Sequence, residues 1–410
     1  MARRIVVSAL LVLAGATGCK TPGELSGWPS TLTIRSPAQQ SGLIGYAVNT
    51  PPSVQLLDAD GHPIAGANVT FRITTGAGSL TGAAATTGPD GVATVGSWVA
   101  GAGLTQVTAE IPAPFRVAPV VFTTNGLAPD FDINLLFLTP AAVAHQAVFQ
   151  NAAQKWQRIV YGDLPDILVA IPAGVCLGNE PPVNGIIDDV IIFVTLDSID
   201  GPGGVLAGSV PCFIRTFDKL PLYGVMVFDT ADIAALDSVN GLEDVVTHEM
   251  GHVLGFGTLW DPTLFDYLVG PTSSGGTDPH FVGPHALAAF DRIGGASYTG
   301  GGKVPVENQG GQGTVDGHWR ESVFDTELMT GYFNPSVPNP LSIVTVASLE
   351  DEGYLVNYAG ADPYIHTFSE RLGAPSLGGG ARRIPLGNDV LHLPMYLVDD
   401  RGRITGRYQR

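Results

Sequence analysis

The segment from Leu242 to Gly255 constrains the fold of this chain more than any other, because it combines a helical apolar pattern with two histidines one turn apart. Its apolar face consists of Leu242, Val245, Val246, Val253 and Leu254. Gly255 follows, and glycine readily adopts the left-handed conformation that ends many helices. We therefore predict an amphipathic helix that carries His248 and His252 on one face.

The spacing of these two histidines suits a metal ion. Residues four apart on a helix have Cβ atoms about 5–6 Å apart, so both imidazoles can reach one Zn²⁺ at about 2.0–2.1 Å. Glu249 stands beside them, where a carboxylate can act as a catalytic base. A His-Glu-x-x-His pattern also arises by chance in proteins that bind no metal. On an amphipathic helix of an exported chain, however, it predicts one catalytic zinc ion.

A catalytic zinc site needs a third protein ligand and an open position for water. The residues alone leave that ligand open among His280, His285, His318 and a downstream carboxylate. His285 begins an apolar helical run that extends through Phe290, which favours a structural role for its side chain. His280 is kept as a reserve ligand.

Four segments in a fixed order resemble the leishmanolysin-like zinc metallopeptidases, metzincins in which a long insertion precedes the third histidine. They are His248 to Phe256, Phe281 to Ala286, His318 to Arg320 and Glu327 to Thr330. In the compact metzincin pattern the third histidine would stand at the position of Thr258. The resemblance implies that His248, His252 and His318 bind zinc, that Glu249 is the catalytic base and that Met329 forms the Met-turn. It also implies peptide-bond hydrolysis by a zinc-activated water.

The first residues have the layout of a secretory signal peptide, expected over 1–18, with Arg3 and Arg4 before an apolar stretch. Cys19 follows small residues, as in the lipobox of bacterial lipoproteins, so it is a candidate lipid anchor. Ordinary signal-peptide cleavage after Ala16 is the alternative, and it would release the protein without a lipid anchor. We expect an exported protein, either a cell-surface or outer-membrane lipoprotein or a periplasmic or secreted one. Cys176 and Cys212 then remain and are expected to form a disulfide.

The sequence divides into regions that differ in composition and hydrophobic pattern, and these predict a multidomain protein. Residues 19–30 resemble a tether, and 31–126 show short alternating runs between Gly-rich turns, which predict an all-β immunoglobulin-like sandwich. That region also resembles bacterial immunoglobulin-like domains of the invasin and intimin type. Residues 127–360 predict an α+β catalytic domain of metzincin type with a zinc-binding active-site helix, and 361–410 a small C-terminal β segment.

Charge and composition limit the partners. Acidic side chains outnumber basic ones by 38 to 20, giving a formal net charge of −18, which repels phosphate backbones and argues against nucleic acid. We expect protein or peptide substrates, lying extended along a rim at Val205 to Ile214, and membrane contact only through Cys19. The sequence leaves the oligomeric state open. The rival hypothesis is a surface adhesion lipoprotein with an immunoglobulin-like binding domain and a non-catalytic zinc site.

Overall fold

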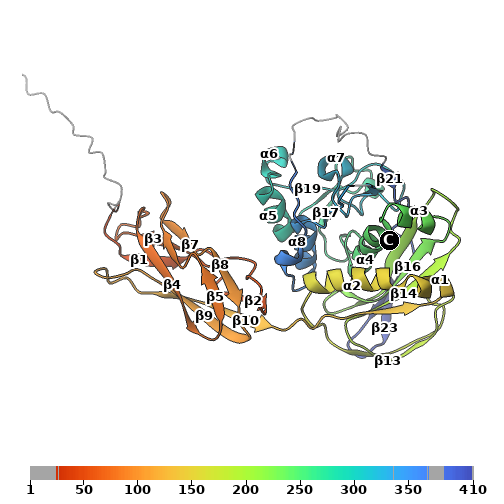
Figure 1. Ribbon diagram of the computed structural model, residues 1–410, viewed down its shortest axis with the longest axis horizontal. Coiled ribbons are helices and arrows are strands. Elements are labelled where there is room, and N and C mark those ends of the chain that lie inside the picture. The colour runs from red at the N-terminus through yellow and green to blue at the C-terminus, as the bar shows by residue number, and fades with distance from the viewer. Residues whose placement is uncertain (1–24, 26, 336, 367, 369–382, 409–410) are drawn as a thin grey trace, which may run out of the picture. The chain divides into compact units, whose positions relative to one another are not determined.

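The structure is a computed structural model that describes residues 25, 27–335, 337–366, 368 and 383–408. The expected signal peptide, Cys19 and most of the expected tether lie outside the described residues. The chain divides into two compact units, the first formed by described residues within 25–40, 50–98 and 104–124, and the second by 41–49, 99–103 and residues from 125 onward. Multiple sheets and a smaller number of helices make this a mixed α/β protein of more than one unit (Figure 1).

Ten strands lie within the described residues that precede residue 128. They are β1 (Thr31–Ile34), β2 (Gln39–Leu43), β3 (Ser53–Leu57), β4 (Asn68–Thr75), β5 (Gly78–Thr81), β6 (Ala84–Thr86), β7 (Val92–Thr94), β8 (Ser97–Ala100), β9 (Gly103–Glu110) and β10 (Val120–Leu127). They form a three-stranded sheet β1-β3-β7, a five-stranded sheet β2-β10-β9-β4-β6 and the pair β5-β8. Burial alternates along β3, as expected for a strand with one face on a core. Phe71, Trp98 and Phe122 are among the large buried side chains.

The second unit is built on a six-stranded sheet in the order β11-β14-β16-β15-β22-β23. Its strands are β11 (Ile133–Phe137), β14 (Val190–Asp197), β15 (Ala207–Arg215), β16 (Pro221–Asp229), β22 (Met395–Val398) and β23 (Ile404–Tyr408). β11, β14 and β16 run parallel to one another, while β15 pairs antiparallel with β16. β14, β15 and β16 are almost wholly buried, which matches their nearly continuous apolar sequences.

Helices pack on this sheet through an apolar core. α1 (Pro140–Ala144) begins where Thr139 accepts a hydrogen bond from the backbone of Ala142, and α2 (Gln146–Ile159) follows after a break at His145. Thr139 and Pro140 are typical of a helix start and apolar residues recur at helical spacing through Val160, so the sequence alone predicts one helix here, which the structure breaks at His145. α2 packs against α4 (Leu242–Leu254), and α4 lies against β15 and β16. Trp156 of α2 donates a hydrogen bond to the carbonyl of Thr247, which ties the two helices together.

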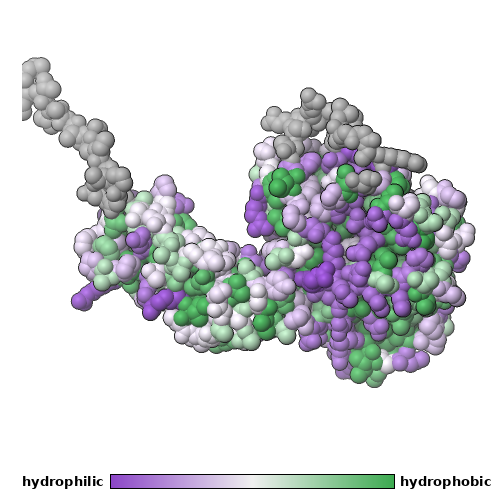
Figure 2. Space-filling model, in the orientation of Figure 1, coloured by the Kyte–Doolittle hydropathy of each residue, from purple (hydrophilic) through white to green (hydrophobic). Residues whose placement is uncertain are grey.

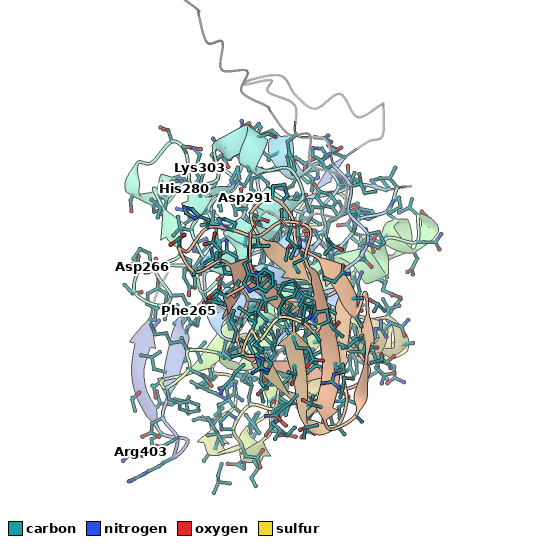
Figure 3. All side chains as sticks on the ribbon, turned by 90° about the vertical axis from the view of Figure 1, so that its left-hand side faces the viewer. Phe265, Asp266, His280, Asp291, Lys303 and Arg403 are labelled. Carbon is teal, nitrogen blue, oxygen red and sulfur yellow. A yellow bond between two sulfur atoms is a disulfide. The ribbon has the colours of Figure 1, made fainter. Side chains whose placement is uncertain are left out.

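Shorter elements complete the unit. They are β12 (Ile167–Ile171), β13 (Val183–Ile187), α3 (Ile233–Ser238), β17 (Leu268–Val269), η1 (Thr272–Ser274), β18 (His280–Phe281), α5 (Pro284–Arg292), α6 (Ala296–Thr299), β19 (Val304–Pro305), α7 (Glu321–Phe324), β20 (Tyr332–Phe333), α8 (Ile343–Glu352), η2 (Tyr358–Gly360) and β21 (Ile384–Pro385). The last strands, β22 and β23, form a hairpin with Arg403 at its turn (Figure 3). Because β22 pairs with β15, the described residues of the expected C-terminal segment extend the main sheet.

This pairing corrects the expectation of an open rim at Val205 to Ile214. β22 runs parallel to β15, with Phe213 opposite Tyr396 and Arg215 opposite Val398. Val390 pairs with Ser209 in the same direction. The edge of β15 that the sequence left free for a peptide is therefore occupied by the chain itself.

Cys176 and Cys212 form a disulfide, at a sequence separation of 36. Cys212 lies in the buried strand β15. Closing a loop of this length restricts the unfolded chain by about 4 kcal/mol in the chain-entropy treatment. We expect Cys212→Ser to lower the free energy of unfolding of the second unit by about 2–4 kcal/mol, measured by denaturant titration against the parent chain. Cys176→Ser should match it, and an unchanged midpoint in both would contradict a stabilising role.

The visible surface of the second unit is mainly hydrophilic, with small hydrophobic groups between the polar side chains (Figure 2). Within the described part of the chain, every helix is too short or too polar to cross a membrane.

Candidate metal centre

α4 places three functional side chains inside the second unit. His248, Glu249 and His252 are all buried on this helix. The helix ends after Leu254, where Gly255 has a φ of 124°, a value that side-chain-bearing residues rarely adopt. The chain then turns back, so that the carbonyl of Phe256 lies 2.9 Å from Nδ1 of His252. The local sequence thus builds both the helix and the partner that orients its second histidine.

His318 reaches the same point from a separate segment. Its backbone is held by Glu307, whose N–H donates to the carbonyl of His318 at 2.8 Å, and the next residue, Trp319, pairs with both Val306 and Thr330. The ring of His318 is buried, and its Nδ1 lies 2.8 Å from the carbonyl of Thr314. The structure therefore brings together the three histidines that the resemblance implied.

The three Nε2 atoms converge. They are 3.0 Å apart between His248 and His252, 3.0 Å between His252 and His318, and 3.2 Å between His248 and His318. Three nitrogens bound at about 2.0–2.1 Å to one tetrahedral zinc ion would lie about 3.3 Å apart. The spacing therefore suits zinc.

The tautomers suit a metal as well. Nδ1 of His248 lies 2.7 Å from the carbonyl of Leu328, and the other two Nδ1 atoms also face backbone carbonyls. A carbonyl oxygen only accepts hydrogen bonds, so each neutral ring carries its proton on Nδ1 and presents a lone pair on Nε2. All three lone pairs are therefore available at the point of convergence.

A carboxylate that the sequence analysis did not single out completes the group. Oδ2 of the buried Asp389 lies 3.1 Å from Nε2 of His318 and 3.2 Å from Nε2 of His248. These four residues form one candidate metal-binding cluster. Asp389 follows Gly387 and Asn388, a sequence typical of a surface turn, and no local pattern distinguished it from other turn residues. The nearest expectation from the sequence was that a downstream carboxylate could be the third zinc ligand.

Burial and mutual charge set the pKa values of these groups. Burial lowers the pKa of His248 below 6.5, and burial with the neighbouring histidines lowers that of His252 well below it. Burial would also lower the pKa of His318, but Asp389, together with Thr314 and Glu307, outweighs it and the pKa is raised. Burial would raise the pKa of Asp389, yet His318 and His248 hold it well below its usual range. The site thus holds a charged carboxylate against imidazoles, an arrangement that a cation would stabilise.

Glu249 is oriented by β15. Its Oε2 accepts a hydrogen bond at 2.7 Å from the hydroxyl of Ser209, while its Oε1 is buried without a partner among the described residues. Burial raises the pKa of Glu249 well above 4.5, and the charge of Asp389 adds to that rise. A buried carboxylate oxygen with no protein partner is a natural place for a water or a substrate N–H.

Met329 packs against α4. It is fully buried, and a Cβ built on Gly251 of α4 would lie 3.0 Å from its sulfur. Its backbone N–H donates to the buried carboxylate of Glu327, and its carbonyl accepts from Trp319. Met329 therefore contacts the helix that carries the histidines.

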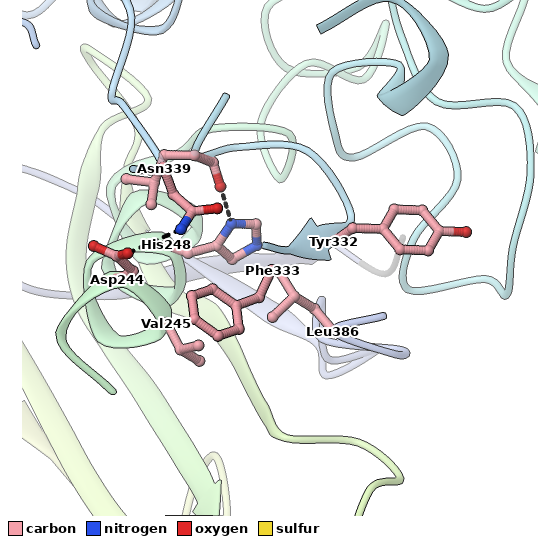
Figure 4. Close-up of a pocket in the computed structure, with 8 residues that line it drawn as sticks. Asp244, Val245, His248, Tyr332, Phe333, Asn339 and Leu386 are labelled. Atoms are coloured by element: carbon pink, nitrogen blue, oxygen red, sulfur yellow. Dashed lines mark hydrogen bonds between the residues drawn. The ribbon is translucent and has the colours of Figure 1, made fainter. Parts of the chain in front are cut away.

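A small pocket borders His248, and it is lined in part by Tyr332 and Leu386. The Tyr332 ring points away from His248 (Figure 4).

The two alternative histidines lie apart from the cluster. His280 is half-buried in β18, its Nδ1 is 2.8 Å from the carbonyl of Asp278, and Figure 3 places it near Lys303. His285, at the start of α5, has a half-exposed side chain whose Nδ1 is 3.3 Å from a carboxylate oxygen of Glu350. Neither histidine is part of the buried cluster.

Sequence comparison finds a peptidase family that matches the region of His248, His252 and His318 but not Asp389. Residues 179–367 match Peptidase_M8, the leishmanolysin family. This region is leishmanolysin-like. A leishmanolysin homolog from Crithidia fasciculata is 29% identical to this chain over 179 residues, which is 42% of this chain. The chain covers 26% of that relative's length.

Similarity to solved structures is weaker. The D00-D0 domain of Intimin is 19% identical with a TM-score of 0.18, and covers 26% of this chain and 50% of its own. The D0-D1 domain of Intimin is 20% identical with a TM-score of 0.18, over 23% of this chain and 48% of its own.

Proposed function

We propose that this protein is an exported zinc-dependent endopeptidase whose second unit is a metzincin-type catalytic domain. The observation that carries the proposal is the convergence of three buried Nε2 atoms beside the carboxylate of Glu249. His248, His252 and His318 would hold one zinc ion. When bound, zinc polarises the scissile carbonyl and lowers the pKa of water.

The chain's own residues supply the proton transfers. Glu249 accepts a proton from the attacking water and later delivers it to the leaving amine. The hydroxyl of Ser209 holds Oε2 in place, so that the unpaired Oε1 is free to take the proton. A wholly structural metal site would have no use for this second, unpaired oxygen.

The N-terminal regions fit export in this proposal. Residues 1–18 would be a signal peptide, Cys19 a lipid attachment site, and the first unit an immunoglobulin-like sandwich that separates the enzyme from the cell surface. Proteins or peptides would be the substrates. Metabolic labelling with a fatty acid tests the anchor, since Cys19→Ala should abolish incorporation.

A second candidate function is favoured by one observation. Oδ2 of Asp389 stands where a catalytic zinc site would keep an open position, and a closed four-ligand set is typical of structural zinc. In that case the protein would be a surface adhesion lipoprotein with a non-catalytic metal site.

Metal dependence tests the proposal. A zinc-loaded chain is expected to cleave an unfolded generic protein, and the cleavage should stop when a chelator removes the metal and return when Zn²⁺ is added back. Product fragments on a gel and zinc content per chain are measured together. Cleavage that persists in fully demetallated protein would contradict a zinc mechanism.

A further inference from the structure

The C-terminal segment enters the metal centre from the edge of the main sheet. Leu386 donates to the carbonyl of Gly331 at 3.1 Å, directly after β21 pairs with β20. Asn388 then accepts a hydrogen bond from the N–H of Gly313 at 3.2 Å. The segment is therefore anchored at Leu386 and Asn388, shortly before Asp389.

At Asp389 the segment joins β15. Ser209 donates its backbone N–H to the carbonyl of Asp389 at 2.8 Å and accepts from Leu391 at 3.1 Å. The same Ser209 binds Glu249 through its side chain. The backbone groups of β15 that lie beside the proposed catalytic base are thus already paired.

A peptide substrate needs those same backbone groups. An extended peptide gains sequence-independent affinity by pairing with the free edge of a sheet. On β15 one edge is paired with β16 and the other with residues 389–391 and β22. Next to this path lies a recess of about 360 Å³, one wall of which is formed by Pro385, Gly387 and Asn388. A peptide cannot reach the metal along β15 while the segment remains.

We propose, on the basis of the proposed peptidase function, that Asp389 is a fourth metal ligand and that residues 384–391 hold the enzyme in a latent form. Oδ2 of Asp389 lies 3.1–3.2 Å from two of the ligand nitrogens, a distance that suits a shared zinc ion. The segment lies along the edge that substrate would use. Activation requires the segment to leave the metal, and because Asp389 is the segment's ligand there, loss of this carboxylate weakens the segment's hold.

The first test compares the full-length parent, Asp389→Ala, Asp389→Ala/Glu249→Gln and the control Asp400→Ala, which alters an exposed carboxylate at the turn of the β22–β23 hairpin. Each is loaded with Zn²⁺ for metal content and cleavage, and with Co²⁺ for its visible spectrum. Asp389→Ala is expected to keep one metal ion, with affinity lowered at least about tenfold. Its Co²⁺ spectrum should respond to azide, which adds to an open position, whereas the spectra of the parent and the control should not.

Cleavage should rise at least about tenfold in Asp389→Ala, because even a ten-to-one preference for the closed form leaves only about a tenth of the molecules competent. The added Glu249→Gln change should remove that activity. Equal cleavage by the parent and Asp389→Ala, with the parent already responsive to azide, would overturn latency and leave the peptidase intact. Loss of metal from Asp389→Ala without cleavage would overturn latency and favour a structural site. If Asp389→Ala keeps its metal and its Co²⁺ spectrum responds to azide, but the variant does not cleave, the proposed peptidase function and the latency that rests on it are both overturned. Asp389 would then still be a metal ligand.

A second variant displaces the segment without altering a ligand. A Cβ on Gly313 would lie 2.6 Å from the backbone of Asn388, whereas one on Gly302 would meet nothing within 4 Å. Gly313→Ala is therefore expected to raise cleavage and open the Co²⁺ site, and Gly302→Ala to behave as the parent. A folded Gly313→Ala protein, judged by circular dichroism, that keeps the parent's spectrum and rate would overturn the role of the segment.

Discussion

Glu249→Gln is expected to reduce peptide cleavage by about 10²–10⁴-fold while the protein keeps its zinc, because a positioned general base contributes that much to such reactions. Glutamine has the shape of glutamate and can still accept the Ser209 hydrogen bond, so the fold and the three histidines should be undisturbed. The comparison is made in the parent and in Asp389→Ala. The latter removes any masking by the C-terminal segment.

A matched control lies on the same helix. Glu243 of α4 is exposed and accepts a hydrogen bond from Asn151. Glu243→Gln changes the same functional group and should leave cleavage unchanged. Equal activity in Glu249→Gln and Glu243→Gln would remove Glu249 from the mechanism.

His318→Ala is expected to have the second large effect, on metal binding rather than on the chemical step. Removing one of three converging imidazoles should weaken zinc binding at least about 100-fold, since loss of even a residue that only orients a ligand costs about 10–100-fold. Zinc competition with a chromophoric chelator measures this directly. Metal loss should also lower the thermal midpoint, because a ligand that binds only the folded state stabilises it.

His280→Ala and His285→Ala serve as controls for this assignment. Both histidines lie apart from the buried cluster. Each variant should retain one zinc ion per chain with the parent's affinity. Full zinc retention in His318→Ala, or zinc loss in His280→Ala, would contradict the ligand set.

How much of the centre the sequence could predict depended on the distance between its parts. His248 and His252 are four residues apart on one helix, so their geometry follows from helical periodicity alone. His318 was left open by the residues and was singled out only by a family resemblance. In space it joins His252 across 66 residues of sequence, a separation at which residue spacing carries no geometric information.

Asp389 could not have been predicted in this way. It lies 141 residues from His248 and arrives through the pairing of a late segment with β15, a contact that depends on the whole sheet. For the same reason the edge of β15 was expected to be free. The break between α1 and α2 at His145 was missed too, because an apolar pattern that spans a break looks the same as one that spans a continuous helix.

The most direct test of the central claim is the appearance of new peptide termini in an unfolded protein incubated with the zinc-loaded chain, identified by mass spectrometry. The parent and Asp389→Ala are each compared with the corresponding Glu249→Gln variant, and zinc content is recorded for all four. A zinc endopeptidase predicts internal cleavage by Asp389→Ala that disappears with Glu249→Gln while zinc stays bound. No new termini from any zinc-loaded chain, with the open metal position demonstrated in Asp389→Ala, would contradict it.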